Sequence, residues 1–510
     1  MAEKYVIGFD MGTGSCRASI YRPDGQVMGT GVTEYPTYHP HPGWAEQKPE
    51  DWWNCLQKSM KEALEKSGVD KEDIVAMSYD VTCCSVMLCK KDGTPIRDCL
   101  LWMDVRSAKE AADIAATGDP ALKYNGFGNV SAEWMPCKAL WLKRNEPENY
   151  AAADVVCECA DWVTHQLTGK WTCNMSNIAA RWYYDSRNGG FPKSLYESIG
   201  LADVLDKFPQ EIHDLGDNLG PIRKEAAEFL GLSENTIIAQ GGVDAYIGCF
   251  GLGVISPGKI ALITGSSHLI LGLTDVYHYG STGVFGPFPG DIRPEYGLFE
   301  GGQTSSGSIV SWFKDNFCQD LKDKEGGIYG ELNREAAKLP PGSDGLLVCD
   351  WWQGNRTPYT DPNLRGNIYG LSLNHTQAHL FRAIMEGVAY GTENVFQSFR
   401  EAGYPVDEIY MGGGTTNSEL FMQIHADVSN VPVNVPEDPQ SMALGSAILA
   451  TKGAGIYDTF EDAVAHMVRY TKRVEPIPEN HEAYKKYFAK YREVYGKFGD
   501  WMRETTALNQ

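Results

Sequence analysis

The chain has 510 residues, with 45 Lys and Arg against 67 Asp and Glu, and therefore a formal net charge of −22. This length exceeds what one hydrophobic core supports and predicts two domains. The acidic balance argues against nucleic acid or an anionic membrane as a partner, because either requires a basic face. The first residues carry no apolar core and no apolar run approaches membrane-spanning length. We therefore expect a cytoplasmic protein without a signal peptide.

The 13 cysteines are scattered without a C-x-x-C motif, which favours free thiols in a reducing compartment. His375 and His379 have the i, i+4 spacing of a helical metal pair. Their segment lacks the glutamate of the H-E-x-x-H motif, so we do not predict a metal site there.

The N-terminal segment, residues 5–21, predicts a β-hairpin with a polar turn. An apolar strand ends at Asp10, a Gly/Thr/Ser turn follows, and a second strand leads to Tyr21. Backbone N–H groups and the Thr13 and Ser15 hydroxyls of such a turn suit an oxyanion such as phosphate. Asp10 at the strand end could hold Mg²⁺ through water. An ordinary hairpin with a flexible turn is the alternative that this segment alone leaves open.

The next segments predict an alternation of helix and strand. Residues 50–67 form an amphipathic helix, 74–79 a strand, 80–83 the loop beyond it, and 86–90 another strand. Further on, the strand 236–239 precedes a Gly-Gly turn and Asp244. Its carboxylate could act as a base in a cleft, or cap the helix that begins near Ala245, or do both.

A Gly/Pro stretch at residues 251–258 marks the division between the domains, which we place at 1–254 and 255–510. A second strand–turn–strand pattern follows at once, with Thr264, Gly265 and Ser266 in the turn. Two hairpins of the same design, one in each half of the chain, predict two similar domains that hold a polyphosphate between them.

A third glycine cluster, Gly412 to Gly414, follows an apolar strand and precedes a helix at residues 419–429. Missing side chains let a bulky ligand approach the backbone, and the helix N-terminus adds a positive dipole end. No Walker-type loop or dinucleotide fingerprint occurs in the chain, so we expect the nucleotide in a cleft between domains. The final helix, residues 478–506, carries an aromatic stripe that we expect to dock on its own domain.

Two segments carry a resemblance to a known family. Residues 366–371 and 379–387 match the C-terminal signature of the FGGY carbohydrate kinases at each specified position. The N-terminal signature is met only in part at residues 134–143, where Lys138 and Trp141 fit but Met135 and Ala139 depart. The chain thus resembles this family from about residue 5 to about residue 470. The resemblance implies an α/β fold of two actin-like ATPase (ribonuclease H-like) lobes with an interdomain cleft, and implies ATP and Mg²⁺.

The resemblance also implies roles for individual residues. The catalytic base would be Asp244, and the carboxylate on the Mg²⁺ side would be Asp10. The 1–254 lobe would bind the sugar and carry the first phosphate loop, and the 255–510 lobe would bind the nucleotide. The residues implied at the nucleotide are Thr13, Ser15 and Arg17 in the first phosphate loop, Thr264, Gly265 and Ser266 in the second, Gly412, Gly413 and Asn417 at the adenosine, and Gln303 beside it.

On the acceptor side, the chain is most similar to ribulokinases. The positions implied at the ketopentose are Cys83, Trp102, Arg181, Asp244 and Glu300. Arg181 replaces a lysine of the L-ribulose enzymes, which would change how hydroxyl stereochemistry is read. Two interpretations compete with direct sugar contact. Arg181 and Glu300 could form a structural ion pair, and Trp102 could be a core aromatic.

The function predicted is ATP-dependent phosphorylation of a terminal hydroxyl of a ketopentose, with ribulose favoured. Xylulose, another short ketose or a polyol such as ribitol stays open as the acceptor. A non-catalytic sugar- or nucleotide-binding relative and a chaperone ATPase are the alternatives from other classes. The expected partners are a small sugar and ATP, without nucleic acid or membrane, and a homodimer is considered as the assembly.

Overall fold

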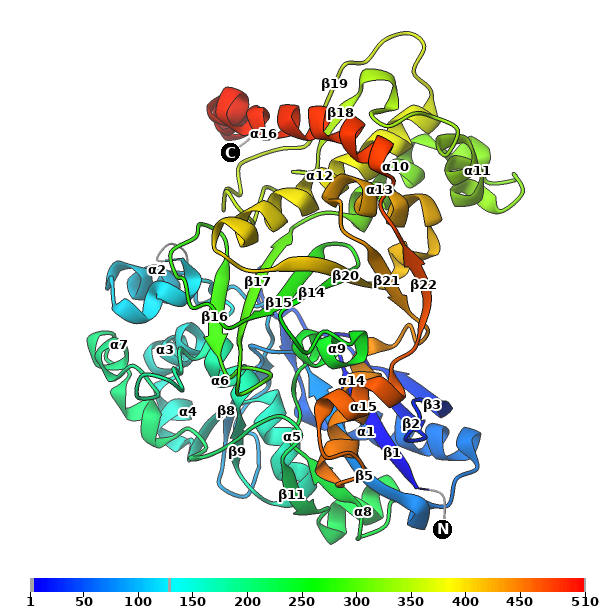
Figure 1. Cartoon of the computed structure of the whole chain (residues 1–510). Helices are drawn as coiled ribbons and strands as arrows, with labels where there is room; N and C mark the ends of the chain where they lie inside the picture. The colour runs from blue at the N-terminus through cyan, green and yellow to red at the C-terminus, as the bar shows by residue number, and fades with distance from the viewer. Residues whose placement is uncertain (1–3, 127–129, 509–510) are drawn as a thin grey trace. The chain divides into compact units, whose positions relative to one another are not determined.

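A computed structural model describes residues 4–126 and 130–508 and divides the chain into two compact units (Figure 1). Unit 1 comprises Met1–Ile255, Gly286–Leu298 and Gln440–Arg469, and unit 2 comprises Ser256–Phe285, Phe299–Pro439 and Tyr470–Gln510. Two later segments of the chain therefore return to unit 1. The roles predicted for the two domains stay predictions.

Unit 1 is built around one mixed sheet in the strand order β11-β12-β5-β1-β2-β3, with β13 paired to β5. Its strands are β1 (Tyr5–Met11), β2 (Ser15–Tyr21), β3 (Val27–Glu34), β5 (Ile74–Val81), β11 (Asn218–Pro221), β12 (Ile237–Ala239) and β13 (Gly242–Val243). A smaller sheet holds β4 (Glu46–Gln47), β7 (Cys99–Leu100), β6 (Val86–Cys89) and β8 (Val155–Glu158), and β9 (Thr172–Asn174) pairs with β10 (Glu211–His213).

The helices of unit 1 are α1 (Pro49–Ser67), α2 (Ala108–Ala116), α3 (Met135–Asn145), α4 (Pro147–Ala152), α5 (Cys159–Thr168), α6 (Met175–Arg181), α7 (Lys193–Ser198), α8 (Lys224–Leu230), α9 (Asp244–Leu252), α14 (Ser441–Gly453) and α15 (Phe460–Met467).

Helices cover both faces of the main sheet of unit 1. Ile7 and Phe9 point into the core that includes Trp52 of α1. Gly8 lies between them and points to the opposite face, because side chains alternate along a strand. A Cβ on Gly8 would lie 1.9 Å from the Ala443 carbonyl oxygen, so glycine is required for α14 to pack this closely on β1.

Unit 2 has a second mixed sheet that includes the strand order β17-β15-β14-β20-β21-β22. Its strands are β14 (Gly258–Thr264), β15 (His268–Thr274), β17 (Gly297–Gln303), β20 (Val406–Gly413), β21 (Val433–Pro436) and β22 (Tyr470–Val474), and β18 (Leu347–Cys349) pairs with β19 (Asn367–Tyr369). Its helices are α10 (Gly307–Phe317), α11 (Gly327–Ala336), α12 (Gln377–Glu401), α13 (Glu419–Ser429) and α16 (Pro478–Ala507), and β16 (Phe285–Pro289) lies at the division between the units.

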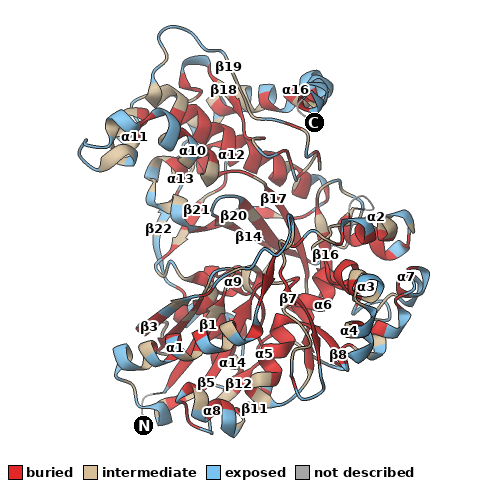
Figure 2. Cartoon of the chain, turned by 180° about the vertical axis from the view of Figure 1, so that it is seen from behind, coloured by how far each residue is buried: buried red, intermediate tan, exposed pale blue. Residues whose placement is uncertain are grey.

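The same strand motif opens both units. In unit 1, β1 pairs antiparallel with β2 and parallel with β5; in unit 2, β14 pairs antiparallel with β15 and parallel with β20. The central strands of both units are buried (Figure 2). The α/β fold implied by the family resemblance is confirmed, and so is the hairpin that each glycine-rich turn predicted.

Most of the predicted elements are present. The helices expected at 50–67 and 419–429 are α1 and α13, and the C-terminal helix is α16. On α16, Tyr484 and Tyr491 are fully buried in the core of unit 2, as the aromatic stripe predicted. The helix expected from Ala245 begins one residue earlier, so Val243 is the cap residue and Asp244 lies in the first turn.

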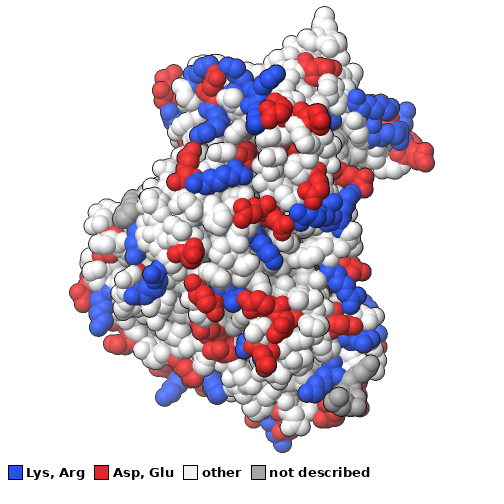
Figure 3. Space-filling view, in the orientation of Figure 1, with Lys and Arg blue, Asp and Glu red and all other residues white. Residues whose placement is uncertain are grey.

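All 13 cysteines have free thiols, as predicted, and only Cys83 is not buried. Within the described residues, no helix is both long and apolar enough to cross a membrane. On the face drawn in Figure 3, acidic and basic side chains are intermingled. In the part of the chain that the structure describes, many acidic and basic side chains pair locally, as Arg473 does with Glu408 at 2.7 Å.

Candidate active site

Three aspartates gather at one edge of the main sheet of unit 1. β1 and β5 run parallel with Asp10 directly opposite Asp80. β13 also runs parallel to β5, with Gly242 opposite Asp80, and Asp244 follows β13 at the start of α9. Because the carboxyl ends of parallel strands meet at the same edge, the three carboxylates share one neighbourhood, which is where open α/β sheets bind ligands.

The environments of these aspartates differ. Asp80 is fully buried and accepts a hydrogen bond from the Ser446 hydroxyl at 2.7 Å. Burial raises its pKa well above the usual range, and the charge of Asp10 raises it further. Burial also raises the pKa of Asp10, while a hydrogen bond with Asp80 and the nearby Arg17 guanidinium lower it. Arg17 lies 3.4 Å from the Asp10 carboxylate, so the predicted phosphate-loop arginine contacts the predicted Mg²⁺-side acid.

Burial raises the pKa of Asp244 to about 7. The Ala245 N–H, which donates to the carboxylate at 2.6 Å, opposes this shift, and the charge of Asp10 adds to it. A carboxylate with a pKa near neutral is a stronger base than an ordinary aspartate, and it is still ionised in part of the molecules at physiological pH.

The turn between β1 and β2 is held by its neighbours. The Gly12 N–H donates to the Ser15 carbonyl at 3.0 Å, and Gln47 donates to the Thr13 carbonyl at 2.6 Å. The indole N–H of Trp102 donates to the Thr13 hydroxyl at 3.0 Å. Trp102, predicted at the sugar, therefore lies beside Thr13, predicted at the phosphate.

Arg181 and Cys83 also belong to unit 1. The buried Arg181 guanidinium lies 5.5 Å from the ring centre of Trp134, 5.7 Å from that of Tyr246 and 5.8 Å from that of Phe288, distances at which a cation interacts with aromatic faces. Cys83 is half-buried in the loop after β5. Glu300 lies on β17 of unit 2 and is buried. A structural ion pair between Arg181 and Glu300 stays a prediction.

In unit 2, the turn between β14 and β15 contacts the start of α10. The Gly307 N–H donates to the Gly265 carbonyl at 3.1 Å, and the Ser306 N–H donates to the Ser266 carbonyl at 2.9 Å. These bonds fix the backbone of the turn that was predicted as the second phosphate loop.

Thr264 and Gly413 lie opposite each other on the parallel strands β14 and β20. The Thr264 hydroxyl donates to the Gly412 carbonyl at 2.9 Å. Gly413 has φ +110°, and a Cβ there would lie 1.9 Å from the Thr264 carbonyl oxygen, so only glycine fits at this position.

A pocket of about 740 Å³ opens in unit 2 between this turn and helices α10–α13. Three of the predicted nucleotide residues line it: Gly265, Ser266 and Asn417. Its walls combine aromatic and aliphatic side chains with polar ones, including Trp312, Tyr329, Asn333, Phe381, Met385, Gly414, Thr415, Ser418 and Phe421. Such a mixture suits a flat heterocycle with a polar substituent.

Gln303 lies inside unit 2. Its amide nitrogen donates to Asp350 at 2.8 Å, and its amide oxygen accepts from Thr392 at 2.7 Å. His268 approaches the same oxygen at 3.1 Å. In the described structure this side chain joins a buried network, and the nucleotide contact predicted for it stays a prediction.

Among the described residues, no group of three or more His, Cys, Asp and Glu side chains is arranged to hold a metal ion. His379 instead closes the capping box at the start of α12, where its Nδ1 accepts from the Thr376 N–H at 3.2 Å. His379 therefore has a structural role, as part of the cap at the start of α12.

Comparison with known proteins identifies the family. The model of the "FGGY family of carbohydrate kinases, N-terminal domain" matches residues 5–251, and that of the C-terminal domain matches residues 260–454. The chain belongs to the FGGY family of carbohydrate kinases. It is therefore a sugar kinase, and FGGY kinases use ATP.

The chain is similar to named relatives over nearly its full length. It is 31% identical to a ribulokinase of Anoxybacillus flavithermus, covering 98% of this chain and 95% of that protein. It is 33% identical to a ribulokinase of Mycolicibacterium smegmatis (98% and 94%) and 28% identical to a xylulose kinase of Bacillus subtilis (96% and 97%).

Solved structures confirm the fold. A xylulose kinase from Rhodospirillum rubrum matches with a TM-score of 0.86 at 25% identity, covering 98% of this chain and 100% of that one. A Plasmodium falciparum glycerol kinase with ADP matches with a TM-score of 0.84 at 20% identity, covering 96% and 98%. The two actin-like lobes predicted from the sequence are those of this fold.

Sequence reasoning missed two parts of the site. Asp80 begins the loop predicted at residues 80–83 and was given no role, although a carboxylate after an apolar strand is the same signal that marked Asp10. The pocket residues Trp312, Phe381 and Phe421 follow ordinary helical core patterns, and only their convergence in space distinguishes them.

Proposed function

We propose that this FGGY kinase transfers the γ-phosphoryl group of ATP to a terminal hydroxyl of a ketopentose, with ribulose as the favoured acceptor. The relatives named ribulokinase, at 31% and 33% identity, support this choice over the xylulose kinase at 28%. The observation that carries the catalytic part is the convergence of Asp10, Asp80 and Asp244 at one sheet edge, with the pKa of Asp244 raised to about 7.

In the proposed reaction, Asp244 is the general base. Its carboxylate accepts the proton of the terminal hydroxyl as the hydroxyl oxygen forms a bond to the γ-phosphorus. The bond between the γ-phosphorus and the β,γ-bridging oxygen breaks, and ADP leaves with that oxygen. Asp244 then holds the proton until solvent removes it.

We assign Asp10 to the Mg²⁺ ion that accompanies ATP. Its side chain is 18% exposed, and the adjacent Gly12 presents no side chain. One accessible carboxylate suits Mg²⁺, which keeps several waters and is otherwise held by substrate phosphates. When bound, the ion neutralises charge on the phosphoryl oxygens.

For the nucleotide, we assign the adenosine to the pocket of unit 2. Of the residues that line it, Gly265 and Ser266 would meet the phosphates and Asn417 would meet the adenosine. Gly412 and Gly413 lead into this pocket through Gly414, and Thr264 fixes their backbone. In unit 1, Thr13, Ser15 and Arg17 form the proposed first phosphate loop.

For the sugar, we assign Cys83, Trp102, Arg181 and Glu300. The Arg181 guanidinium is surrounded by aromatic rings, which restricts how its planar fork can turn. A fork held in this way places its N–H donors differently from an ammonium group, so we expect a preference among ketopentoses that differs from that of enzymes with lysine.

A coupled assay of ADP release tests the proposal. The purified full-length protein is given ATP, Mg²⁺ and one acceptor from a panel of both enantiomers of ribulose and xylulose, with ribitol and a no-sugar control. Ribulose should give the highest kcat/KM, and the product should carry phosphate on its terminal carbon by ³¹P and ¹³C NMR. Asp244→Asn is the matched inactive control.

Other outcomes reject the proposal in part or completely. A higher kcat/KM for xylulose or ribitol would reject ribulose as the acceptor while keeping the kinase. Binding of sugar and ATP by calorimetry, without ADP release for any acceptor, would favour the non-catalytic relative and reject the enzyme.

A further inference from the structure

We propose that Lys138 is a positioning residue of the sugar site, whose buried ammonium group clamps the two loops that carry Cys83 and Trp102. Lys138 lies on α3 and is fully buried. This inference rests on the proposed function, because it concerns the acceptor side of the same reaction.

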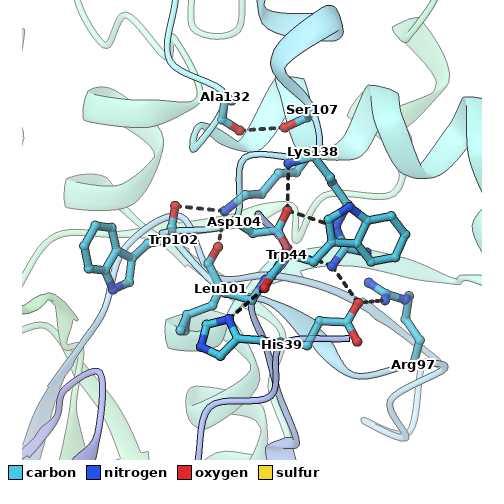
Figure 4. Close-up of polar contacts among 12 residues, drawn as sticks. His39, Trp44, Arg97, Leu101, Trp102, Asp104, Ser107, Ala132 and Lys138 are labelled. Atoms are coloured by element: carbon cyan, nitrogen blue, oxygen red, sulfur yellow. Dashed lines mark hydrogen bonds and ion pairs between the residues drawn. The ribbon is translucent and has the colours of Figure 1, made fainter. Parts of the chain in front are cut away.

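The ammonium group of Lys138 is directed at main-chain carbonyls of both loops. Its Nζ donates to the Cys84 carbonyl at 2.7 Å and to the Leu101 carbonyl at 2.6 Å, and the Trp102 carbonyl lies at 3.4 Å. Figure 4 shows the side chain reaching Leu101 and Trp102. An ammonium group has three N–H donors and no acceptor, so these carbonyls account for all of its hydrogen bonds.

A fully buried lysine destabilises the fold unless its ammonium group is hydrogen-bonded. Taking an ammonium group out of water without partners is strongly unfavourable, and burial lowers the pKa of Lys138. An apolar side chain of the same volume would fill the space, but it could not draw carbonyls of two separate loops toward one point. The contacts therefore indicate that the ammonium group is there to fix the geometry of the loops.

The loop after β5 is held from its other side as well. The Cys84 N–H donates to the buried Glu158 carboxylate at 2.6 Å, while the Cys84 carbonyl accepts from Lys138. Cys84 has φ +59°, a left-handed conformation that a non-glycine residue adopts only when its surroundings impose it. Lys138 and Glu158 together set the direction of the half-buried Cys83.

The second loop has a matching anchor at its far end. The Asp104 carboxylate accepts from the Ala45 N–H at 2.7 Å and from Nε of Arg106 at 2.9 Å. Lys138 holds the near end at Leu101 (Figure 4). Trp102 lies between these two anchors, and its indole N–H reaches the Thr13 hydroxyl at 3.0 Å. The clamp thus extends from α3 through Trp102 to the proposed first phosphate loop.

The test compares two lysines of the same helix. Lys138→Met keeps an unbranched side chain that is one atom shorter, and it removes the donors. Lys143→Met is the matched control, because Lys143 also lies on α3 and donates to a loop carbonyl, that of Gly200 at 2.8 Å, away from the proposed site. Displacing catalytic or binding groups by about 1 Å can cost on the order of 10²-fold in rate.

We expect Lys138→Met to lower kcat/KM for the sugar by about ten- to a hundred-fold. The KM for ATP should change less, because Lys138 reaches the proposed phosphate loop only through Trp102. Lys143→Met should leave both parameters at wild-type values. Melting curves are recorded for each variant, since a purely structural role would lower the melting temperature without moving the KM for the sugar. An unchanged sugar KM and kcat in folded Lys138→Met would overturn the proposal.

A double-mutant cycle then tests the route through Trp102. Trp102→Phe alone should raise the sugar KM, and the double variant should be no worse than the poorer single variant, because both changes disturb one element. Fully additive losses would contradict the clamp. If Lys138→Met and the milder Lys138→Gln both fail to fold, the sugar KM of Trp102→Phe is the deciding measurement. An unchanged sugar KM in that variant rejects the proposal.

These outcomes are separable from a failure of the proposed function. Wild-type protein without sugar-dependent ADP release would reject the kinase assignment to ketopentoses. Wild-type protein with that activity, beside a Lys138→Met variant of unchanged sugar kinetics, would reject only the positioning role.

Discussion

The pH dependence of sugar phosphorylation tests the role of Asp244 most directly. Burial raises the pKa of its carboxyl to about 7, and a base must be ionised to accept a proton. With that pKa, the ionised fraction is about 0.1 at pH 6, about 0.5 at pH 7 and about 0.9 at pH 8. We therefore expect kcat/KM for the sugar to rise about ten-fold between pH 6 and pH 8. An aspartate at its ordinary pKa would give a flat profile over this range.

The raised pKa of Asp244 also predicts that the stability of the protein falls as the pH rises, whereas its activity increases. A carboxyl whose pKa is raised on folding stabilises the protein when protonated, and this contribution is lost as the pH rises from about 4, the unfolded value, through about 7. About three pKa units correspond to at most about 4 kcal/mol. Asp244→Asn removes the ionisable group. At pH 8 it should raise the free energy of unfolding by up to this amount, with a smaller gain at pH 5.

Two measurements on the wild-type protein and on Asp244→Asn test whether Asp244 is the base. Initial rates from pH 5.5 to 8.5, with the coupling enzymes in excess, give the profile, and urea unfolding at pH 5 and pH 8 gives the stabilities. Turnover of Asp244→Asn should fall by about 10²–10⁴ while its stability at pH 8 rises. Near-normal turnover of this variant, or a flat wild-type profile between pH 6 and pH 8, would refute the assignment of Asp244 as the base.

Further predictions concern the nucleotide, the sugar and the core. A Cβ on Gly265 would meet only the Ser267 carbonyl, at 3.9 Å, so Gly265→Val should fold normally; calorimetry should show ATP affinity reduced at least about ten-fold and sugar binding unchanged. Glu300→Gln should raise the ketose KM about ten- to a hundred-fold at constant ATP KM. Arg181→Lys should change the order of kcat/KM among the ketopentoses of a panel. Lower melting temperatures of both variants, with that order unchanged, would instead indicate a structural ion pair. Arg382→Met removes the cationic partner, at 2.9 Å, of the buried Glu386 carboxylate, which keeps hydrogen bonds from Gly342, Ser343 and Tyr484. The free energy of unfolding in urea should fall by about 3–5 kcal/mol, whereas a loss below about 1 kcal/mol would contradict this.

Local sequence patterns predict the framework of this protein well, because each hairpin is encoded within about 17 residues. Apolar strands on either side of a Gly/Ser turn specify β1–β2 and β14–β15 without help from distant residues. The same holds for α13, whose Ser418 cap and apolar periodicity both lie within the helix. These features depend on neighbours along the chain, which a single sequence contains.

The details of the site depend on distant neighbours and could not be predicted in this way. Gln303 follows two glycines, a pattern typical of a binding loop. It is instead the last residue of β17, and its amide is hydrogen-bonded to Asp350 and Thr392. Their partnership requires the packing of α12 and β18 around β17. Similarly, the clamp of Lys138 joins carbonyls from loops that no local pattern connects.

The two hairpins have the same topology, but the residues at their ends suit them to opposite charges. Where β1 meets its parallel neighbour, Asp10 lies opposite Asp80, so the strand ends carry carboxyl groups that suit a cation or an exchangeable proton. At the corresponding edge of unit 2, Thr264 lies opposite Gly413, and the next residues are small. A hydroxyl and an uncovered backbone suit an oxyanion, since main-chain N–H groups can approach it closely. Duplication of one strand motif thus explains the fold. The exchange of acidic for small residues explains why we assign the base and Mg²⁺ to unit 1, and the adenosine and the second phosphate loop to unit 2.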